Sequence, residues 1–325
     1  MILAHANMLL HISGNPVNTF FENLGNTICF ALFLFCFGAS KFYSKENRDY
    51  KAFIKRIGLL YIAYILIALV FFIEKGYLNN FYEIFSYSIF YKLPPYSEFI
   101  IAFIIYELVF FFFRDLIKHF TKTFVSTLVV GFTFFIIGSL LSIFNIGFLN
   151  PYKALFLGYT NYFSFPIFQY FIFFITGYFY SQYRQSNIIK PKQLLLMIII
   201  TGIVYFFASL FSYLNTDLLK RWPPSFDFIL NNFFIILIFI FLTNLITVFL
   251  DKPKILAVYS NISKYSIHLL YIHIFVLYLA RWAGLNGFFL LTYLFTFIIL
   301  SIPFIIEHHA VKTLYNGLRG KTSTS

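Results

Sequence analysis

Apolar runs of about 20 residues recur along the whole chain, and they constrain the fold more than any other feature of the sequence. A helix of about 20 apolar residues matches the roughly 30 Å hydrocarbon core of a bilayer. Of the 325 residues, 60% are hydrophobic and 11% are charged, against roughly 25% charged in soluble domains. The sequence therefore predicts an all-α, polytopic membrane helix bundle. It predicts no extramembrane catalytic domain, because even the most polar stretch, residues 74–98, is half aromatic and aliphatic.

Breaks at charged residues, or at Pro, Gly and Asn, divide the apolar runs into nine predicted full transmembrane helices. They cover residues 24–41, 57–73, 99–113, 124–146, 165–182, 194–214, 228–250, 265–283 and 288–306. Residues 1–12 form a tenth apolar piece, shorter than the roughly 17 residues that cross a bilayer. We interpret it as the second half of a truncated first helix. The expected organisation is one membrane domain, residues 1–311, followed by a short polar cytoplasmic tail, residues 312–325.

Lysine and arginine residues predict the orientation in the membrane, because translocated loops are depleted of them. If the segment after residue 12 lies outside and the spans alternate, 18 of the 24 basic residues fall in inside loops. This bias predicts a multi-pass protein of the plasma or inner membrane with a cytoplasmic C-terminus. The net charge of +12 is interpreted as the same topology signal, so membrane lipid is an expected partner and nucleic acid is not.

The aromatic and cysteine residues have structural interpretations. The 50 Phe and 25 Tyr residues raise the alternative of a sugar-stacking surface. However, Phe, Tyr, Ile, Lys and Asn are abundant together, which favours a compositional bias. Cys29 and Cys36 lie about 10 Å apart along one predicted helix, too far for a disulfide, and are interpreted as small core residues.

Ionisable residues at bilayer depth are the candidates for chemistry, because a charge there is expensive unless it has a partner or a water-filled cavity. The candidates are His5, Glu107, His268 and His273, with His11 near the outer boundary and about 120° from His5 around the helix. Each also has a structural interpretation: a histidine that donates to a backbone carbonyl, or a buried carboxylate with a partner. His273 lies deeper in its predicted span than His268 and is the better candidate of the two.

Metal and soluble-enzyme chemistries have no sequence support. No His, Asp or Glu pair occurs at i, i+4 spacing on a predicted helix, so no metal site is expected. A phosphate-binding glycine loop, a nucleophile elbow and a paired cysteine motif are also missing from the sequence. A histidine at bilayer depth without metal-binding companions fits a general base, because its pKa near neutrality suits removal of a proton from a hydroxyl or an amine.

Several segments resemble, in order and spacing, the membrane-bound acyltransferase-3 family. They are the Phe-rich residues 30–38, the basic residues 53–57, the FPxxxYxxFFxxGY-like residues 165–178, the RWPPS loop at residues 221–225, and residues 263–273. Heparan-α-glucosaminide N-acetyltransferase-like proteins, which are related, share much of this pattern. The resemblance spans nearly the whole chain, although each motif by itself is of low specificity.

This resemblance implies about ten helices that transfer an acyl group, typically acetyl from cytoplasmic acetyl-CoA, to a sugar hydroxyl or amine on the far side. The family's first helix carries an Arg, ten residues and then a His, and His5 matches that His. The Arg would lie seven residues before Met1, so either the start of the sequence is misassigned or truncated, which we favour, or the chain is a degenerate paralogue. Arg56, with Lys55 beside it, matches basic residues that contact the CoA phosphates, and a topology role is the alternative.

The sequence therefore leads to the hypothesis of a cell-envelope acyltransferase, most simply an O-acetyltransferase that modifies a polysaccharide. His5 would be the general base, Arg56 and Lys55 would bind the donor, and Glu107 and His273 are further buried polar candidates. No bound cofactor is expected, acyl-CoA is the co-substrate, and an extracytoplasmic glycan or lipid-linked sugar is the acceptor. The alternative is a transporter or flippase for a lipid-linked sugar or small solute, with Glu107 and a histidine as a proton relay. A binding or structural membrane protein is a third hypothesis.

Overall fold

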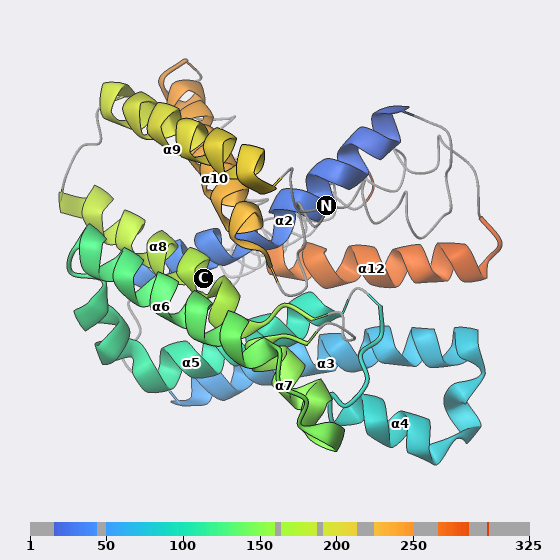
Figure 1. Ribbon diagram of the computed structural model, residues 1–325. Coiled ribbons are helices and arrows are strands. Elements are labelled where there is room, and N and C mark those ends of the chain that lie inside the picture. The colour runs from blue at the N-terminus through green and yellow to red at the C-terminus, as the bar shows by residue number, and fades with distance from the viewer. Residues whose placement is uncertain are drawn as a thin grey trace, which may run out of the picture. The chain divides into compact units, whose positions relative to one another are not determined.

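A computed structural model describes residues 16–43, 50–95, 97–159, 164–186, 191–212, 224–249, 266–285 and 298. Within these residues the chain forms ten α-helices, which confirms the predicted all-helical class (Figure 1). They are α2 (Pro16–Tyr43), α3 (Tyr50–Lys75), α4 (Phe81–Ser88), α5 (Glu98–Phe120), α6 (Phe124–Ser142), α7 (Asn150–Leu157), α8 (Ile167–Ser186), α9 (Pro191–Ser212), α10 (Phe226–Phe249) and α12 (Ser266–Trp282). The 3₁₀ turns η1 (Tyr77–Asn79) and η2 (Gly147–Leu149) precede α4 and α7.

Eight of the nine predicted spans coincide with α-helices of the described residues. Within that part of the chain, three helical stretches are long and apolar enough to cross a membrane: Tyr50–Lys75, Phe124–Ser142 and Phe226–Leu245. The predicted helix at residues 288–306 lies outside the described residues except for Ile298, and so does the apolar piece at residues 1–12.

The chain divides into two compact units. One is Leu24–Leu245, and the other combines Met1–Asn23 with Ile246–Ser325. The larger unit contains the packed helices α3 to α9 and most of α2 and α10, whereas α12 belongs to the smaller unit.

Helices α2 and α8 pack with their backbones in contact, because a glycine on each helix leaves room. A Cβ atom at Gly38 would overlap the carbonyl oxygen of Phe174, and one at Gly177 would overlap the carbonyl oxygen of Phe35. Further along the interface, the rings of Phe30 and Phe165 stack with centroids 3.7 Å apart. These residues belong to the first and third segments of the family resemblance, so two motifs distant in sequence form one interface.

The other helices of the larger unit complete this core. A Cβ atom at Gly131 of α6 would lie 2.6 Å from Cγ1 of Ile172 on α8, so this glycine also permits a close approach. Helices α3 and α5 run side by side, and the rings of Phe53 and Phe111 stack at 3.9 Å.

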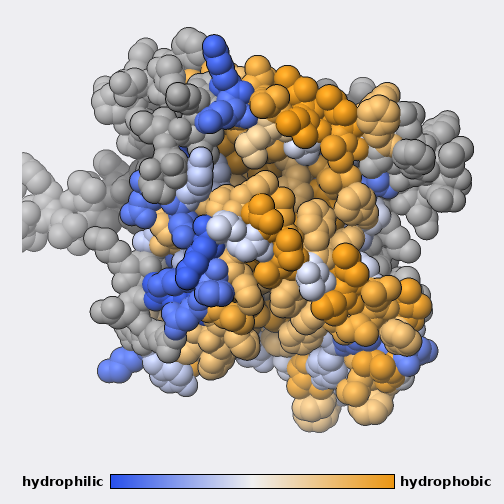
Figure 2. Space-filling view, turned by 60° about the vertical axis from the view of Figure 1, so that its left-hand side comes forward, coloured by the Kyte–Doolittle hydropathy of each residue, from blue (hydrophilic) through white to orange (hydrophobic). Residues whose placement is uncertain are grey.

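The described helix ends that flank three of the loops assigned to the cytoplasm by the lysine and arginine pattern lie at one end of this unit. The ring of Phe42, near the end of α2, contacts Tyr178 of α8 at 5.5 Å. The hydroxyl of Thr121, just after α5, lies 3.4 Å from the side-chain oxygen of Gln182 on α8. This end, which we call the basic end, carries Lys41, Lys51, Lys55, Arg56, Arg114, Lys118, Lys122 and Arg184. Figure 2 shows hydrophilic residues gathered together beside a broad apolar surface.

Helix ends and loops also differ from the sequence prediction. Helix α5 continues to Phe120 across a kink at Phe113, where φ is −111° and ψ is 18°. Helix α6 ends at Ser142 rather than at residue 146, because the side chain of Asn145 accepts a hydrogen bond from the backbone of Gly147 and turns the chain. Helices α4 and α7 lie in segments predicted as loops, and both have only 8 residues.

Candidate functional site

Glu107 lies near the middle of α5 in a run of buried apolar residues, and only 4% of its surface is exposed. One carboxylate oxygen, Oε1, is 2.6 Å from Nζ of Lys41 on α2. The other, Oε2, is 3.5 Å from Nε of Arg56 on α3. Three helices therefore meet at one buried carboxylate, and we call Lys41, Arg56 and Glu107 the inner cluster.

Lys41 stands in the last turn of α2, where a basic side chain is favoured by the negative end of the helix dipole. Its side chain is 7% exposed. The ammonium also lies over two aromatic rings, 5.0 Å from the centroid of Phe37 and 5.6 Å from that of Phe110. Cation–π attraction of this kind adds to the ion pair where water is excluded, so Lys41 is held by α2 and α5 together.

Arg56 is placed differently from Lys41. Its side chain is 32% exposed, so one edge of the guanidinium meets Glu107 while part of the side chain reaches the surface. Lys55, which sequence reasoning paired with it, is exposed. The structure thus joins two of the predicted candidates, Arg56 and Glu107, and adds Lys41, which the sequence had suggested only as a topology signal.

Burial gives the inner cluster its chemical character. A buried carboxylate is stable only when it is paired, and the loss of one partner leaves an uncompensated charge. The three side chains together carry one net positive charge, and Arg114, one helical turn beyond Phe110, lies with its guanidinium carbon 5.8 Å from that ring. The basic end therefore favours an anionic ligand.

The histidine candidates fall partly inside the described residues. His273, on α12 of the smaller unit, is fully buried, and Nδ1 donates to the carbonyl oxygen of Leu269 at 2.7 Å. This bond to the preceding turn is the contact expected of a core histidine. His5 lies outside the described residues, and so does the side chain of His268. Among the residues that the structure describes, no three His, Cys, Asp or Glu side chains form a group that could hold a metal ion.

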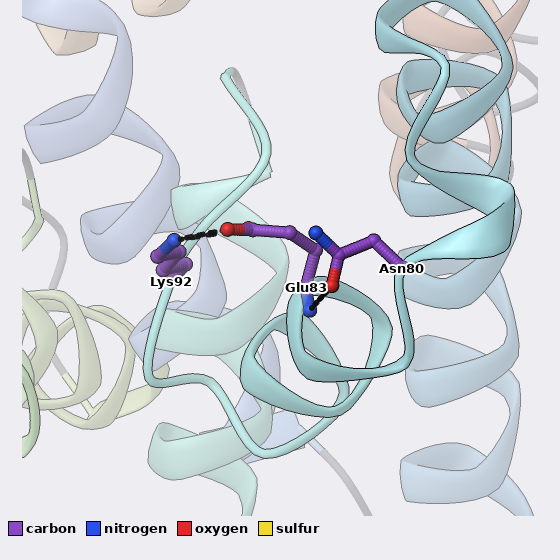
Figure 3. A network of polar contacts seen from close by, with 3 residues as sticks. All are labelled: Asn80, Glu83 and Lys92. Atoms are coloured by element: carbon purple, nitrogen blue, oxygen red, sulfur yellow. Dashed lines mark hydrogen bonds and ion pairs between the residues drawn. The ribbon is translucent and has the colours of Figure 1, made fainter.

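A second polar cluster, which sequence reasoning missed, lies at the opposite end of the larger unit. Nζ of Lys92 lies 2.7 Å from Oε1 and 2.9 Å from Oε2 of Glu83 (Figure 3). Asn80 caps α4, because its Oδ1 accepts a hydrogen bond of 3.2 Å from the backbone of Glu83. We call Asn80, Glu83 and Lys92 the outer cluster. An Asn followed three residues later by Glu is a helix-start signal that could have located it.

The two lysines at this end have opposite pKa shifts. The hydrogen bond to Glu83 raises the pKa of Lys92 above its usual 10.5. Lys153 of α7 is buried, and its ammonium donates to the carbonyl oxygens of Phe144 and, at 2.8 Å, of Ser142. Burial lowers the pKa of Lys153 from 10.5. Lys153 therefore caps the carboxyl end of α6, although burial disfavours the charged form of its side chain.

Comparisons of the chain with models of known families, with curated proteins and with solved structures give no match. The motifs quoted from the sequence and the geometry of the two clusters are therefore the basis for a functional hypothesis.

Proposed function

We propose that the protein is an integral membrane acyltransferase. It transfers an acyl group, most simply acetyl, from cytoplasmic acyl-CoA to a hydroxyl or amine of an extracytoplasmic glycan. In this proposal the chain is a multi-pass protein of the plasma or inner membrane, with nine full spans after a first partial helix and a cytoplasmic C-terminus. The observation that carries the proposal is the inner cluster, a net positive group built into the helix bundle at its basic end.

Acyl-CoA is a polyanion, and its phosphates suit this end of the molecule. Arginine binds phosphate oxygens through two parallel N–H donors, and Arg56 reaches the surface while Glu107 contacts its Nε. Lys55, exposed beside it, adds a second cation. In the proposal these two residues hold the nucleotide end of the donor at the cytoplasmic mouth.

The family resemblance, on which the proposed reaction type rests, includes residues with a structural role in the packing of α2 on α8. Gly38 is the last residue of the first motif, and Gly177 belongs to the third. At each position a Cβ atom would overlap the backbone of the other helix. Residues that match a family pattern are thus also residues that fix helix spacing in this chain.

His5 is the proposed general base. It would accept the proton of the acceptor hydroxyl as that oxygen attacks the thioester carbonyl. A new C–O bond forms, the C–S bond breaks, and the CoA thiolate leaves and takes up the proton from His5. The assignment comes from the sequence, since His5 lies outside the described residues.

The test compares the full-length protein with His5→Ala and with His11→Ala, a matched control six residues further along the same apolar piece. Cells of each variant, with equal membrane expression, are analysed for acyl groups on surface polysaccharide by mass spectrometry. We expect His5→Ala to lose acylation and His11→Ala to keep it. Full acylation by His5→Ala would contradict the assignment of the base.

Donor binding is tested separately with Arg56→Gln and Lys55→Gln in isolated membranes supplied with labelled acetyl-CoA. A raised KM for acetyl-CoA with a near-normal kcat is expected for both variants, and the larger change for Arg56→Gln. Movement of an unmodified sugar or solute across the membrane, with no acyl transfer by the unaltered protein, would overturn the proposal in favour of the transport alternative.

A further inference from the structure

The segment after α3 turns back and lies against the second half of that helix (Figure 1). The ring of Tyr87 packs on Phe72 with centroids 5.1 Å apart. The hydroxyl of Tyr61 donates to the carbonyl oxygen of Ser88 at 3.3 Å. Phe72 and Tyr61 are about 16 Å apart along α3, so α4 covers roughly three turns of a membrane-capable helix rather than lying in an open loop.

Helix α4 has two distinct faces. Ser86 and Tyr87 are buried against the rest of the unit. The opposite face exposes Phe81 (80%), Tyr82 (62%) and Phe85 (52%), and Ile89, at the end of the helix, extends the same stripe. At 100° per residue, the four residues fall within about 100° of arc, and Glu83 lies on the other side of the helix.

Contacts on the buried side of α4 fix the orientation of this apolar face. The hydroxyl of the buried Tyr64 donates to the carbonyl oxygen of Tyr87 at 2.7 Å. Phe90, at φ 62°, occupies the left-handed region that usually requires glycine. Its ring contacts Tyr64 with centroids 5.0 Å apart, and Tyr91 N donates to the carbonyl oxygen of Ser86 at 2.9 Å. A strained turn maintained by aromatic contacts indicates that the orientation of α4 is specified.

We propose that α4 lies in the interfacial region of the outer leaflet, with Phe81, Tyr82 and Phe85 inserted among the lipids. Aromatic side chains gather at this depth because their rings tolerate both the headgroups and the acyl chains. Helix α3, on which α4 packs, is itself membrane-capable and exposes apolar side chains, with Ile62 and Leu66 58% and 44% exposed. The inference rests on α3 spanning the membrane, as in the proposed function, and does not depend on acyl transfer.

The composition of the exposed face favours lipid over a sugar. A sugar platform surrounds its aromatic ring with hydrogen-bonding groups that orient the ligand. Here the polar side chains of Asn80, Glu83 and Lys92 bond to one another or to the start of α4. The outer cluster thus anchors the helix and borders the aromatic stripe at one edge, where Nζ of Lys92 lies 5.5 Å from the centroid of the Tyr82 ring. A cation beside a tyrosine ring fits the headgroup depth of a membrane interface.

The test places a single tryptophan in the full chain after Trp222→Phe and Trp282→Phe. Phe85→Trp reports on the proposed lipid face, Tyr87→Trp reports on the buried face of the same helix, and Ile62→Trp reports on the side of α3. Each protein is reconstituted in phosphatidylcholine vesicles brominated either near the glycerol or near the bilayer centre. Fluorescence quenching gives the depth of the indole.

We expect shallow bromines to quench Phe85→Trp at least twice as strongly as deep ones, and Tyr87→Trp to be shielded from both. Quenching of Phe85→Trp by aqueous iodide but by neither lipid would overturn the inference, and so would a spectral shift on addition of a soluble oligosaccharide. If neither lipid quenches Ile62→Trp, then α3 does not span the membrane. That result would contradict the membrane placement itself, so the two failures are distinguishable.

Discussion

The inner and outer clusters contain the same ion pair in different surroundings. Nζ of Lys41 is 2.6 Å from Glu107, and Nζ of Lys92 is 2.7 Å from Glu83. The side chains of the inner pair are 7% and 5% exposed, whereas those of the outer pair are 37% and 16% exposed. The two ion pairs have similar distances but contribute differently to stability. Water screens the exposed outer pair, whereas each buried charge of the inner pair needs its partner for compensation.

The largest difference between the two clusters is expected from Glu107→Gln. This change keeps the side-chain shape but removes the carboxylate that compensates Lys41 and Arg56. Loss of one partner of a buried pair typically costs about 3–5 kcal/mol. We expect the free energy of unfolding, measured in mixed micelles, to fall by that amount, and the matched outer change Glu83→Gln to cost far less.

A double variant distinguishes lost pairing from a simple packing defect. Lys41→Met together with Glu107→Gln removes both charges of the tight pair, so it should recover a large part of the stability that Glu107→Gln loses. If the double variant is less stable than Glu107→Gln, then Lys41 stabilises the protein through its contacts with the rings of Phe37 and Phe110 rather than through its ion pair with the carboxylate.

Gly38 and Gly177 allow the close approach of α2 and α8. Gly177→Ala places a Cβ against the backbone of Phe35, so α2 and α8 must separate near Lys41. Overpacking of this kind costs about 1–3 kcal/mol. The matched control is Gly58→Ala in α3, where no atom lies within 4 Å of the added Cβ and a gain of roughly 0.5–1 kcal/mol is expected. Equal effects of the two changes on thermal unfolding would contradict the close α2–α8 contact.

The outer region offers a glycine that is needed for a different reason. Gly76 turns the chain from α3 into η1 at φ 69°, and an added Cβ would meet nothing within 4 Å. Gly76→Ala should therefore lower the free energy of unfolding only by the roughly 1–2 kcal/mol that a left-handed backbone costs a residue with a Cβ atom. Gly76→Asn, which tolerates this region better, should cost less than Gly76→Ala in the same unfolding measurement. The reverse order would show that space, and not backbone conformation, limits this position.

The helices were predictable from the sequence because apolar runs and their breaks report directly on bilayer-length elements. Helix α4 was not predictable by the same rule, because its 8 residues bury little surface by themselves and depend on contacts with Tyr64 and Phe72 of α3. Phe90, whose ring contacts Tyr64, has a left-handed conformation with no local sequence signal.

The candidate site was predictable only in part. Glu107 was identified because a carboxylate in an apolar run needs a partner. The partner itself could not be named, because Lys41 is 66 positions away and satisfies the topology pattern equally well. Pairing between distant helices is fixed by packing, and the close approach of α2 and α8 through Gly38 and Gly177 is a tertiary property.

The smallest expected effect belongs to the outer pair and depends on pH. Glu83 raises the pKa of Lys92 above 10.5, so the folded protein holds this proton more tightly than the unfolded chain. The stabilisation is fully present below pH 10.5 and is lost as the pH rises through the higher pKa of the folded state. Near neutral pH, Glu83→Gln should reduce the free energy of unfolding by less than about 1 kcal/mol.

Above pH 10.5 the difference between the unaltered protein and Glu83→Gln should shrink towards zero, because deprotonated Lys92 no longer pairs. Lys153 provides the opposite sign. Its lowered pKa means that the folded state releases this proton first, so stability is gained as the pH rises towards 10.5. Lys153→Met should therefore remove a rise in the free energy of unfolding at alkaline pH. Glu83→Gln should instead remove a fall in the free energy of unfolding at alkaline pH. If both variants changed the pH profile of unfolding in the same direction, then burial and pairing would not be what separates these two lysines.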